Sequence, residues 1–323
     1  MLLAVLFVVI AVSVIAFMTT MPGRSYRGPL PPLSPEESET AANLKKHVAY
    51  LAGTVGERNV IAYQALESTR QYIEDFTRGA GYKVNSQEYV LEMRKVRNLI
   101  VEIPGTTRPS EIVVIGAHYD TVYDCPGADD NSSGVAALLE LARLLKSARP
   151  ARTLRFVAFV NEEPPWFQTE DMGSLLYAQH ARKLNENIVA AVSLETIGMY
   201  SDVEGSQKYP AGFGLLYPSK GDFIGFIGNV SSRALVREAI GAFRETTRFP
   251  SEGAAVPAAI PGVSWSDHWS FWNQGYPAIM VTDTAPFRNE NYHRPGDRPE
   301  TLDYERMARV VRGLEKVVIK LGR

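Results

Sequence analysis

The sequence predicts an α/β sandwich with a mainly parallel central sheet, and two observations support this prediction. Short runs rich in β-branched and aromatic residues alternate along the chain with longer amphipathic stretches. This alternation is typical of strands connected by helices that pack over the sheet. Of the 323 residues, 45% are hydrophobic and 22% are charged. Such a balance fills a globular core and excludes a disordered or fibrous chain.

The N-terminal segment departs from that balance because it is almost entirely apolar. Residues 2–18 carry one hydroxyl group and no charge, and as a helix they would reach about 26 Å, the thickness of a thin bilayer. We therefore interpret residues 1–20 as a membrane anchor, or as a secretory signal if they are cleaved.

Two features bear on the side of the membrane where the rest of the chain lies. Arg24 and Arg27 follow the apolar segment and no basic residue precedes it, which favours a cytoplasmic domain by the positive-inside rule. A large following domain can override so small a basic flank. We expect the domain to be extracytoplasmic, in the periplasm or the extracellular space, anchored if the segment is retained and secreted if it is cleaved.

The segment after residue 20 is rich in proline and leads into the folded domain. Five prolines lie between positions 22 and 35, which predicts an extended linker over residues 21–35. Ser34 is followed by a proline and two acids, the pattern of a helix N-terminus, and Leu44 and Val48 come later at helical spacing. Residues 36–323 contain no repeat and no second linker, so we expect one domain there.

The remaining elements follow in order. The strands are expected at residues 83–91, 98–103, 111–117, 154–160, 188–194 and 278–282. The helices after the first are expected at residues 62–80, 133–148, 173–184, 232–246 and 304–321.

The charges and the cysteine content exclude several kinds of partner and site. The chain has 34 Lys and Arg against 36 Asp and Glu, a formal net charge of -2, so no global basic field exists to recruit nucleic acid. A single cysteine, Cys125, excludes an intrachain disulfide framework and a multi-cysteine zinc cage. Any metal would therefore be bound by His, Asp and Glu.

Polar clusters follow four of the expected strands, where the ligand crevice of an open α/β sheet lies. The strand 111–117 ends at His118, and Asp120 lies on the same side because side chains alternate along a strand. An Asp at this spacing can accept the second N–H of a metal-bound imidazole. The next cluster is Gly-Ala-Asp-Asp-Asn-Ser-Ser-Gly at residues 127–134. An Asx turn with a helix N-cap explains one of its polar residues but not Asp129, Asp130 and Asn131 together.

Four further candidate residues, which follow three of the strands, complete the set. Glu162 and Glu163 follow strand 154–160, Glu195 follows strand 188–194, and His293 follows strand 278–282. Adjacent carboxylates in a buried crevice repel each other unless a cation neutralises them. Each residue has a structural explanation on its own. Jointly, histidines and carboxylates at the ends of successive strands are the ligand set that two neighbouring cations with one shared carboxylate require.

These motifs, in this order and at these spacings, resemble those of peptidase family M28, the co-catalytic di-zinc aminopeptidases. The motifs are AHYDTV, GADDNSSG, FVNEE, SLETIG, SDHWSFW and NYHRPGD, and the resemblance runs from about residue 44 to the C-terminus. It implies a three-layer α/β/α sandwich around a mixed, mainly parallel sheet of eight strands. It also implies two Zn²⁺ ions per chain and a peptide substrate, which makes residues 36–323 a metallopeptidase catalytic domain.

The family's ligand set can be carried over position by position. His118 and Glu195 would bind one zinc ion, Glu163 and His293 would bind the other, and Asp130 would bridge the two. Many family members have Asp where this chain has Glu195, and the longer side chain alters its reach.

The resemblance also assigns catalytic roles. The family hydrolyses N-terminal amino acids from peptides with a metal-bridging hydroxide, for which Glu162 would be the general base. Asp120 would orient His118, and Tyr292 would support the oxyanion or simply pack. Asp267 and His268 of SDHWSFW would give secondary support.

Other functions stay open at this point. A serine hydrolase is disfavoured because the chain contains no G-x-S-x-G motif. A glutaminyl-peptide cyclotransferase shares the fold and part of the ligand set, and a metal-dead binding module tethered to a membrane is a further alternative. Residues 200–228, rich in Gly, Phe and Tyr, are expected to border the substrate pocket.

Overall fold

A mixed sheet runs through the centre of the molecule. The computed structural model describes residues 2–210 and 212–323. In that part of the chain the strand order is β1-β2-β4-β3-β5-β8-β6-β7. The strands are β1 (Asn85–Leu91), β2 (Arg94–Ile103), β3 (Arg108–His118), β4 (Arg152–Phe159), β5 (Asn187–Glu195), β6 (Ile224–Gly228), β7 (Ser251–Ala255) and β8 (Ala278–Thr282).

The centre of the sheet is parallel and its flanks are not. The strands β4, β3, β5 and β8 are mutually parallel neighbours. The β1–β2 hairpin adds to β4 in the antiparallel sense, and so does β6 to β8 on the other flank, while β7 is parallel to β6. The predicted mixed, mainly parallel sheet is confirmed.

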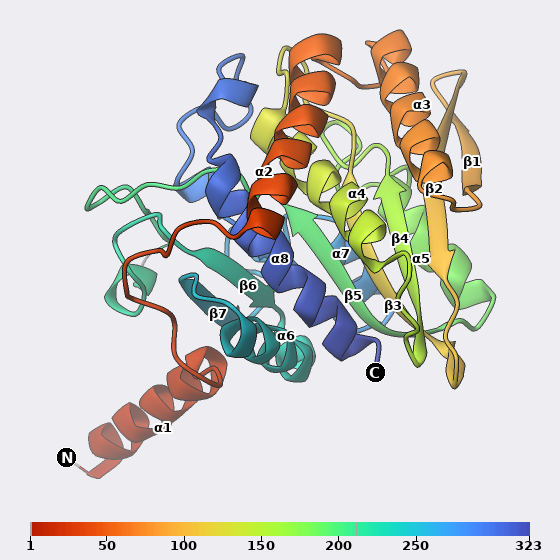
Figure 1. Ribbon diagram of the computed structural model, residues 1–323. Helices are drawn as coiled ribbons and strands as arrows, with labels where there is room; N and C mark the ends of the chain where they lie inside the picture. Colours follow the sequence, from red (N-terminus) through yellow and green to blue (C-terminus); the bar gives the residue numbers. More distant parts are fainter. Residues whose placement is uncertain (1, 211) are drawn as a thin grey trace.

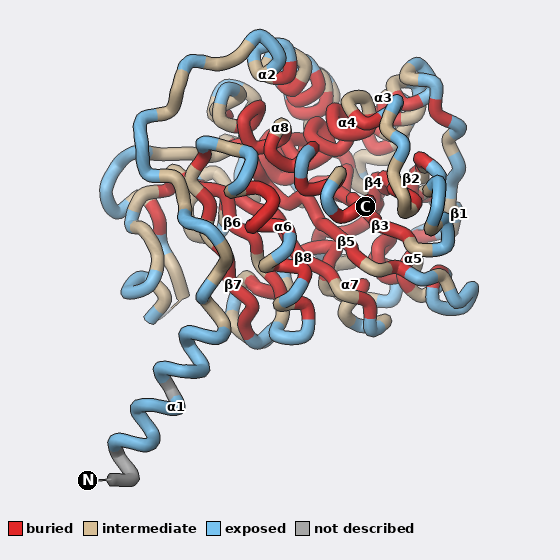
Figure 2. Tube along the Cα trace, turned by 60° about the horizontal axis from the view of Figure 1, so that its bottom comes forward, coloured by how far each residue is buried: buried red, intermediate tan, exposed pale blue. Residues whose placement is uncertain are grey.

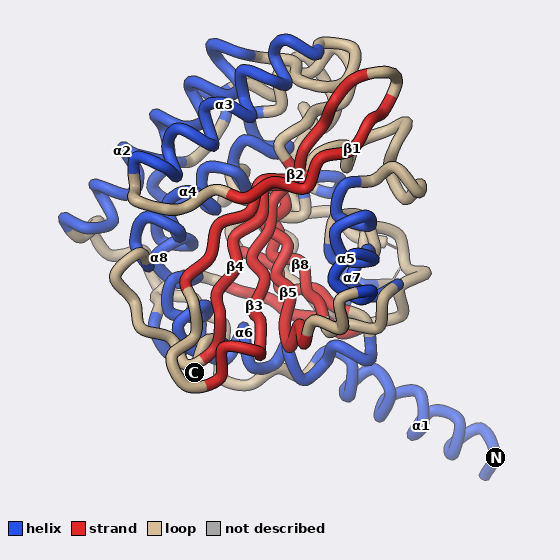
Figure 3. The backbone as a smooth tube through the Cα atoms, turned by 90° about the vertical axis from the view of Figure 1, so that its right-hand side faces the viewer, coloured by secondary structure: helices blue, strands red, loops and turns tan. Residues whose placement is uncertain are grey.

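Helices cover both faces of this sheet. They are α2 (Pro35–Val48), α3 (Tyr63–Gly79), α4 (Gly134–Leu145), α5 (Gly173–Lys183), α6 (Arg233–Thr246), α7 (His268–Asn273) and α8 (Tyr304–Leu321). Figure 3 shows α2, α3, α4 and α8 on one side of the strands and α5 and α7 on the other, and α6 packs against α8 (Figure 1). The three-layer α/β/α architecture is therefore confirmed.

The core lies on both faces of the strands, as Figure 2 shows by the buried trace at the centre of the molecule. Alternate residues of one strand enter different cores. Val113 and Ile115 of β3 join the cluster under α4 and α8, whereas Ile112 and Val114 join the cluster under α5 and α7. This period of two is the alternation expected of a strand that is buried on both faces.

The first helix of the domain begins where the sequence predicts. Ser34 is the N-cap of α2, its hydroxyl accepts the backbone N–H of Glu37, and the Glu37 carboxylate accepts the N–H of Ser34. This capping box and Pro35 at the start of the helix satisfy backbone groups that the first turn leaves free.

The strands β6 and β7 and the helix α7 were not predicted. The strand β6 reads Ile-Gly-Phe-Ile-Gly and β7 reads Ser-Glu-Gly-Ala-Ala. Both are short, two glycines interrupt β6, and β7 has none of the β-branched residues that mark a strand. The helix α7 has six residues, too few for a helical period to show.

The apolar N-terminal segment forms α1 (Leu2–Thr19), which projects from the domain (Figures 1 and 2). The helix is apolar around its whole circumference and most of its described side chains are exposed. Nowhere in the described residues does a helix combine the length and the apolar character needed to cross a membrane. The membrane anchor over residues 1–20 stays a prediction.

Candidate metal centre and active site

The predicted site residues converge at one edge of the sheet. Because β4, β3, β5 and β8 are parallel neighbours, their carboxyl ends lie side by side. His118 is the last residue of β3 and Glu195 the last of β5. Glu162 and Glu163 follow β4, and the loop after β8 carries His293.

Two clusters of possible ligand atoms share one carboxylate. In the first cluster, His118 Nε2 lies 3.3 Å from Asp130 Oδ1 and 3.2 Å from Glu195 Oε2. In the second, His293 Nε2 lies 3.1 Å from Asp130 Oδ2 and 3.3 Å from Glu163 Oε2. Asp130 thus turns one oxygen to each histidine, which is the arrangement of a carboxylate that bridges two cations.

The donor atoms of these clusters fit a cation. His118 Nε2, Asp130 Oδ1, Glu163 Oε1 and His293 Nε2 are buried and have no hydrogen-bond partner among the described residues. Buried polar atoms are normally paired, because leaving one unpaired costs about 1–3 kcal/mol. Imidazole nitrogen and carboxylate oxygen are zinc ligands, and each cluster supplies three such groups.

The electrostatics of the carboxylates also fit a bound cation. Burial raises the pKa of Glu162 well above its ordinary value, raises that of Glu195, and raises that of Glu163 to about 8. Burial acts on Asp130 in the same direction, but the two histidines beside it hold its pKa below the usual range. A bound cation would favour the ionised form of all four groups.

Glu162 lies next to the first cluster and forms a third group of possible ligand atoms with His118 and Glu163. Its Oε2 is 3.8 Å from His118 Nε2, and the side chain is buried. A carboxylate held at this distance from a ligand cluster, with a pKa raised by burial, is suited to accept and return a proton.

Two aspartates fix the backbone of the ligand loops. Asp120 accepts the backbone N–H of Glu162 and of Glu163, both at 3.1 Å, and its Oδ1 lies 3.6 Å from His118 Nδ1. Asp297 accepts the N–H of Asp129 at 2.9 Å and of Asp130 at 3.0 Å. Asp120 therefore faces the histidine that it is predicted to orient and also holds the loop after β4.

A buried arginine that the sequence analysis missed holds the loop before α4. Arg58 donates to the carbonyl oxygens of Tyr119, Pro126 and Gly127 and to the hydroxyl of Ser132, and it is fully buried. An isolated arginine in a loop carries no motif, so no sequence signal identifies it. Ser266, which donates to Glu195 Oε2 at 2.7 Å, lies within the SDHWSFW motif and could have been found there.

Strained backbone marks three of the ligand loops. His293 has a φ of 58°, Asn161 before Glu162 has 60°, and Thr196 after Glu195 has 44°. Residues other than glycine adopt this left-handed region at a cost of about 1–3 kcal/mol, and such residues cluster at functional sites.

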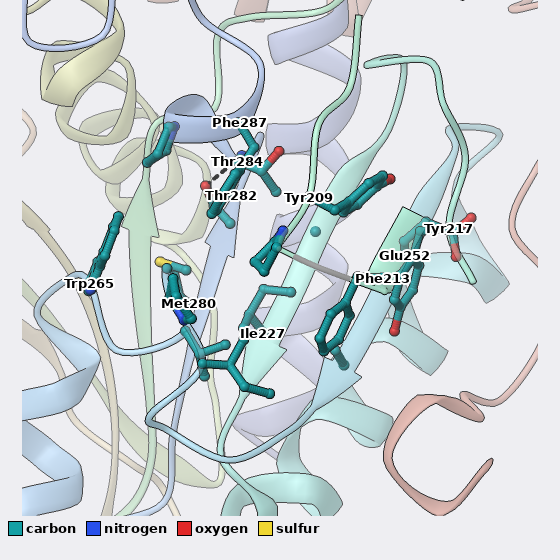
Figure 4. Close-up of a pocket in the computed structure, with 18 of the residues that line it drawn as sticks. Tyr209, Phe213, Tyr217, Ile227, Glu252, Trp265, Met280, Thr282, Thr284 and Phe287 are labelled. Carbon is teal, nitrogen blue, oxygen red and sulfur yellow. Dashed lines mark hydrogen bonds between the residues drawn. The ribbon is translucent and has the colours of Figure 1, made fainter. Parts of the chain in front are cut away.

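A large apolar pocket opens beside the clusters, and Glu195 and Tyr292 belong to its wall. It holds about 840 Å³ of space, part of it open to solvent. Figure 4 shows the rings of Tyr209, Phe213 and Tyr217 gathered on one side of this pocket and Trp265 across from them. Residues 200–228 thus border a pocket, as the sequence suggests, and Tyr292 also stacks on His293 with ring centroids 3.9 Å apart.

The remaining candidates lie behind the site. Asp267 is buried with both carboxylate oxygens unpaired among the described residues, and burial raises its pKa to about 7. His268 is buried and contacts the carbonyl oxygen of Val263 at 2.7 Å. Cys125 is buried and burial raises the pKa of its thiol to about 12, which disfavours a nucleophile.

A three-layer α/β fold with paired His and carboxylate clusters at the carboxyl edge of its parallel strands is that of a metallopeptidase. The model of peptidase family M28 matches residues 98–318. The chain belongs to this family, which confirms the resemblance seen in the motifs and implies zinc.

The chain is also similar in sequence to known proteins. The uncharacterized protein YfbL of Escherichia coli is 39% identical over 280 residues, 84% of this chain and 85% of that protein. Other matched relatives are longer, and the chain spans about half of their length.

Solved structures show the same fold at low sequence identity. BSAP, a zinc aminopeptidase from Bacillus subtilis, aligns with a TM-score of 0.69 at 15% identity, over 87% of this chain and 94% of that one. The glutaminyl cyclase of Tannerella forsythia aligns with a TM-score of 0.63 at 21% identity, over 86% and 98%.

Proposed function

We propose that the chain is an aminopeptidase that uses two zinc ions to release N-terminal amino acids from peptides. The observation that carries this proposal is Asp130, whose two oxygens face His118 and His293 in two ligand clusters. Each cluster is completed by one more carboxylate, Glu195 or Glu163. Two complete clusters with a shared carboxylate suit hydrolysis by a pair of metal ions.

The residues divide the chemistry between them. His118 and Glu195 would hold one zinc ion, His293 and Glu163 the other, and Asp130 both. Bound zinc supplies Lewis acidity, which polarises a carbonyl and lowers the pKa of water. Glu162 takes the proton from the attacking water and delivers it to the leaving amine. Asp120 keeps His118 in the orientation and tautomer that leave Nε2 free to bind.

The apolar pocket supports an exopeptidase that accepts an apolar first residue. Glu195 and Tyr292 lie both at the ligand clusters and in the pocket wall. A substrate whose first carbonyl lies at the clusters therefore places the side chain of that first residue in the pocket. Burial of an aliphatic or aromatic side chain there would contribute about 25 cal/mol of favourable free energy for each Å² of apolar surface. Tyr292 would donate to the oxyanion from this border.

One experiment tests the function and its alternatives. The purified protein is analysed for zinc and assayed with aminoacyl-p-nitroanilides and with a peptide that begins with glutamine. We expect release of p-nitroaniline, fastest for large apolar residues, and no cyclisation. Cyclisation without hydrolysis would instead indicate a glutaminyl cyclase, and neither zinc nor turnover would indicate a binding module.

The role of Glu162 has its own test. Glu162→Gln should retain the zinc content of the wild type, because Glu162 is outside the proposed ligand set, and should lose activity by at least about 100-fold, the scale of general base catalysis. Full activity in this variant would contradict the assignment.

We further propose that the catalytic domain works outside the cytoplasm, since α1 is apolar on all sides and exposed. Accessibility of the domain to added protease in intact spheroplasts, compared with lysed spheroplasts, tests this proposal. Protection in intact spheroplasts would contradict it.

A further inference from the structure

The last residues of α1 and the segment that joins α1 to α2 lie against the domain. We call residues 17–33 the N-terminal strap. Three arginines of α6 donate to its backbone carbonyl oxygens: Arg233 to Phe17 at 2.5 Å, Arg237 to Thr20 at 2.5 Å and Arg244 to Pro22 at 3.0 Å. On α8, Arg309 donates to the carbonyl oxygen of Pro31. Figure 1 shows the strap running from α1 past β7 and α6 to α2.

The side chains of the strap also fit the domain. A Cβ atom on Gly253 of β7 would lie 2.9 Å from the Cγ of Met21, and one on Gly241 of α6 would lie 3.1 Å from the Cγ of Pro22. Any larger residue at these two glycines would therefore press on the strap. The surfaces of α6 and β7 therefore leave room for the strap at the two points where it approaches them most closely.

The strap covers the edge of the sheet. The strand β7 is the last in the strand order, and an edge strand leaves backbone groups unpaired. The N–H of Ser251, at the start of β7, donates to the hydroxyl of Ser25 in the strap at 3.0 Å. The strap thus caps part of an edge that would otherwise face solvent.

The covered strand is also a wall of the apolar pocket. Gly253, Ala254 and Val256 line the pocket, and Met21 packs on Gly253 from outside. Met18 packs on the cluster that contains Ala254, Val256 and Val263. The loops that carry Tyr217 and Val263 also line the pocket, so the strap packs on a strand that forms part of the pocket wall.

We infer that the N-terminal strap is a specificity-determining part of the substrate pocket. Met18 and Met21 hold β7 and the Tyr217 loop in the position that shapes the pocket for a large apolar side chain. This inference rests on the proposed aminopeptidase function. The strap contacts α6, β7, α8 and the cluster of Ala254, Val256 and Val263 and none of the proposed metal ligands, so we expect it to act on substrate binding and not on the metal clusters.

The test uses a double substitution in the full chain, Met18→Ala with Met21→Ala, and a matched control, Leu30→Ala. Leu30 is an apolar strap residue that packs against the main core and does not line the pocket. Steady-state kinetics are measured with phenylalanine and alanine p-nitroanilides. Hydrogen exchange of β7 and of residues 209–217 is measured in parallel, and the melting temperature identifies any global loss of fold.

We expect the double variant to raise KM for the phenylalanine substrate by roughly 3-fold to 10-fold, the scale of lost apolar contacts in a specificity pocket. Its kcat and its KM for the alanine substrate should stay within 2-fold of wild type, and exchange in β7 should rise. Leu30→Ala should change neither the substrate preference nor the exchange of β7.

Two results would overturn the inference: an unchanged preference in the double variant, or an equal change in Leu30→Ala. If the wild type hydrolyses neither substrate, the proposed function fails, and hydrogen exchange then decides the inference alone. Exchange that rises in β7 and residues 209–217 only in the double variant supports the strap as the pocket wall, and unchanged exchange refutes it.

Discussion

At the scale of the residue, the proposed metal centre depends on Asp130 and on the groups that orient it. Its oxygens lie 3.3 Å and 3.1 Å from the two histidines, and Asp297 accepts its backbone N–H at 3.0 Å. The GADD motif made this aspartate a candidate, and the family resemblance implied its bridging role. The motifs could not predict how the loop is held, because Arg58 lies about seventy residues upstream in a sequence without any pattern.

Asp130→Asn should lose zinc and activity together. A neutral amide has one oxygen and cannot bridge two cations, so we expect the zinc content to fall below that of wild type and the rate to fall by at least about 1000-fold, the scale of lost electrostatic stabilisation at a catalytic centre. Metal analysis and p-nitroanilide hydrolysis check this. Glu162→Gln is the control for zinc retention. An Asp130→Asn protein with wild-type zinc would contradict the bridging role.

Arg58→Lys should destabilise the whole domain although the charge is kept. Lysine cannot reproduce the planar fork that serves three carbonyl oxygens and a hydroxyl. We expect a loss of about 3 kcal/mol in the free energy of unfolding, as several buried acceptors lose their donors. Urea denaturation measures it, with the exposed Arg78→Lys as control. Equal stabilities of the two variants would refute this role of Arg58.

At the scale of the element, the sequence predicted the long and strongly patterned pieces. Helix α8 begins and ends at the predicted residues, Tyr304 and Leu321, because its apolar face repeats over five turns. The strands β6 and β7 were not predicted because two glycines interrupt the short β6 and because β7 contains no β-branched residue. Because β7 forms part of the pocket wall, the sequence suggested a pocket at residues 200–228 but did not identify this wall.

Packing of α2 on α4 should depend on pH through Glu140. Burial raises the pKa of this carboxyl, but His47 at 3.8 Å and Arg143 at 3.0 Å outweigh it, so the folded pKa lies below the ordinary 4.5. A carboxyl group with a lower pKa in the folded state than in the unfolded state stabilises the protein at pH values above the unfolded-state pKa. This stabilisation is lost as the pH falls through the folded-state pKa.

Glu140→Gln should therefore destabilise the protein at pH 7 by about 1–3 kcal/mol and by less at pH 4. Urea unfolding at the two pH values measures the difference. Glu238→Gln, on the exposed side of α6, should change stability at neither pH. A Glu140→Gln effect that is equal at pH 7 and pH 4 would contradict the linkage.

At the scale of the whole molecule, the sheet and the ligand clusters form one unit. Carboxylates buried at the ends of β4 and β5 repel one another, and folding must hold them together. The fold class and its ligands were predictable because strand ends carry the chemistry in this architecture. The path of the strap over the domain was not predictable, since proline content indicates an extended segment but not the surface on which the segment packs.

Removal of metal should lower the melting temperature. A metal that binds the folded state stabilises it by RT ln(1 + [Zn]/Kd), about 4 kcal/mol at a thousandfold excess over Kd. We expect chelator treatment to lower the melting temperature by several degrees and zinc to restore it. His293→Ala should show a smaller response to zinc than wild type. A melting temperature that is indifferent to chelator would contradict a metal at this edge of the sheet.

The central claim is that two zinc ions share Asp130, and zinc stoichiometry of the active protein tests it most directly. Mass spectrometry of metal per mole of purified wild-type chain, with His293→Ala measured beside it, should give two zinc ions for the wild type and one for the variant. A fully active wild-type protein with a single zinc ion, or a His293→Ala variant that still binds two, would contradict the claim.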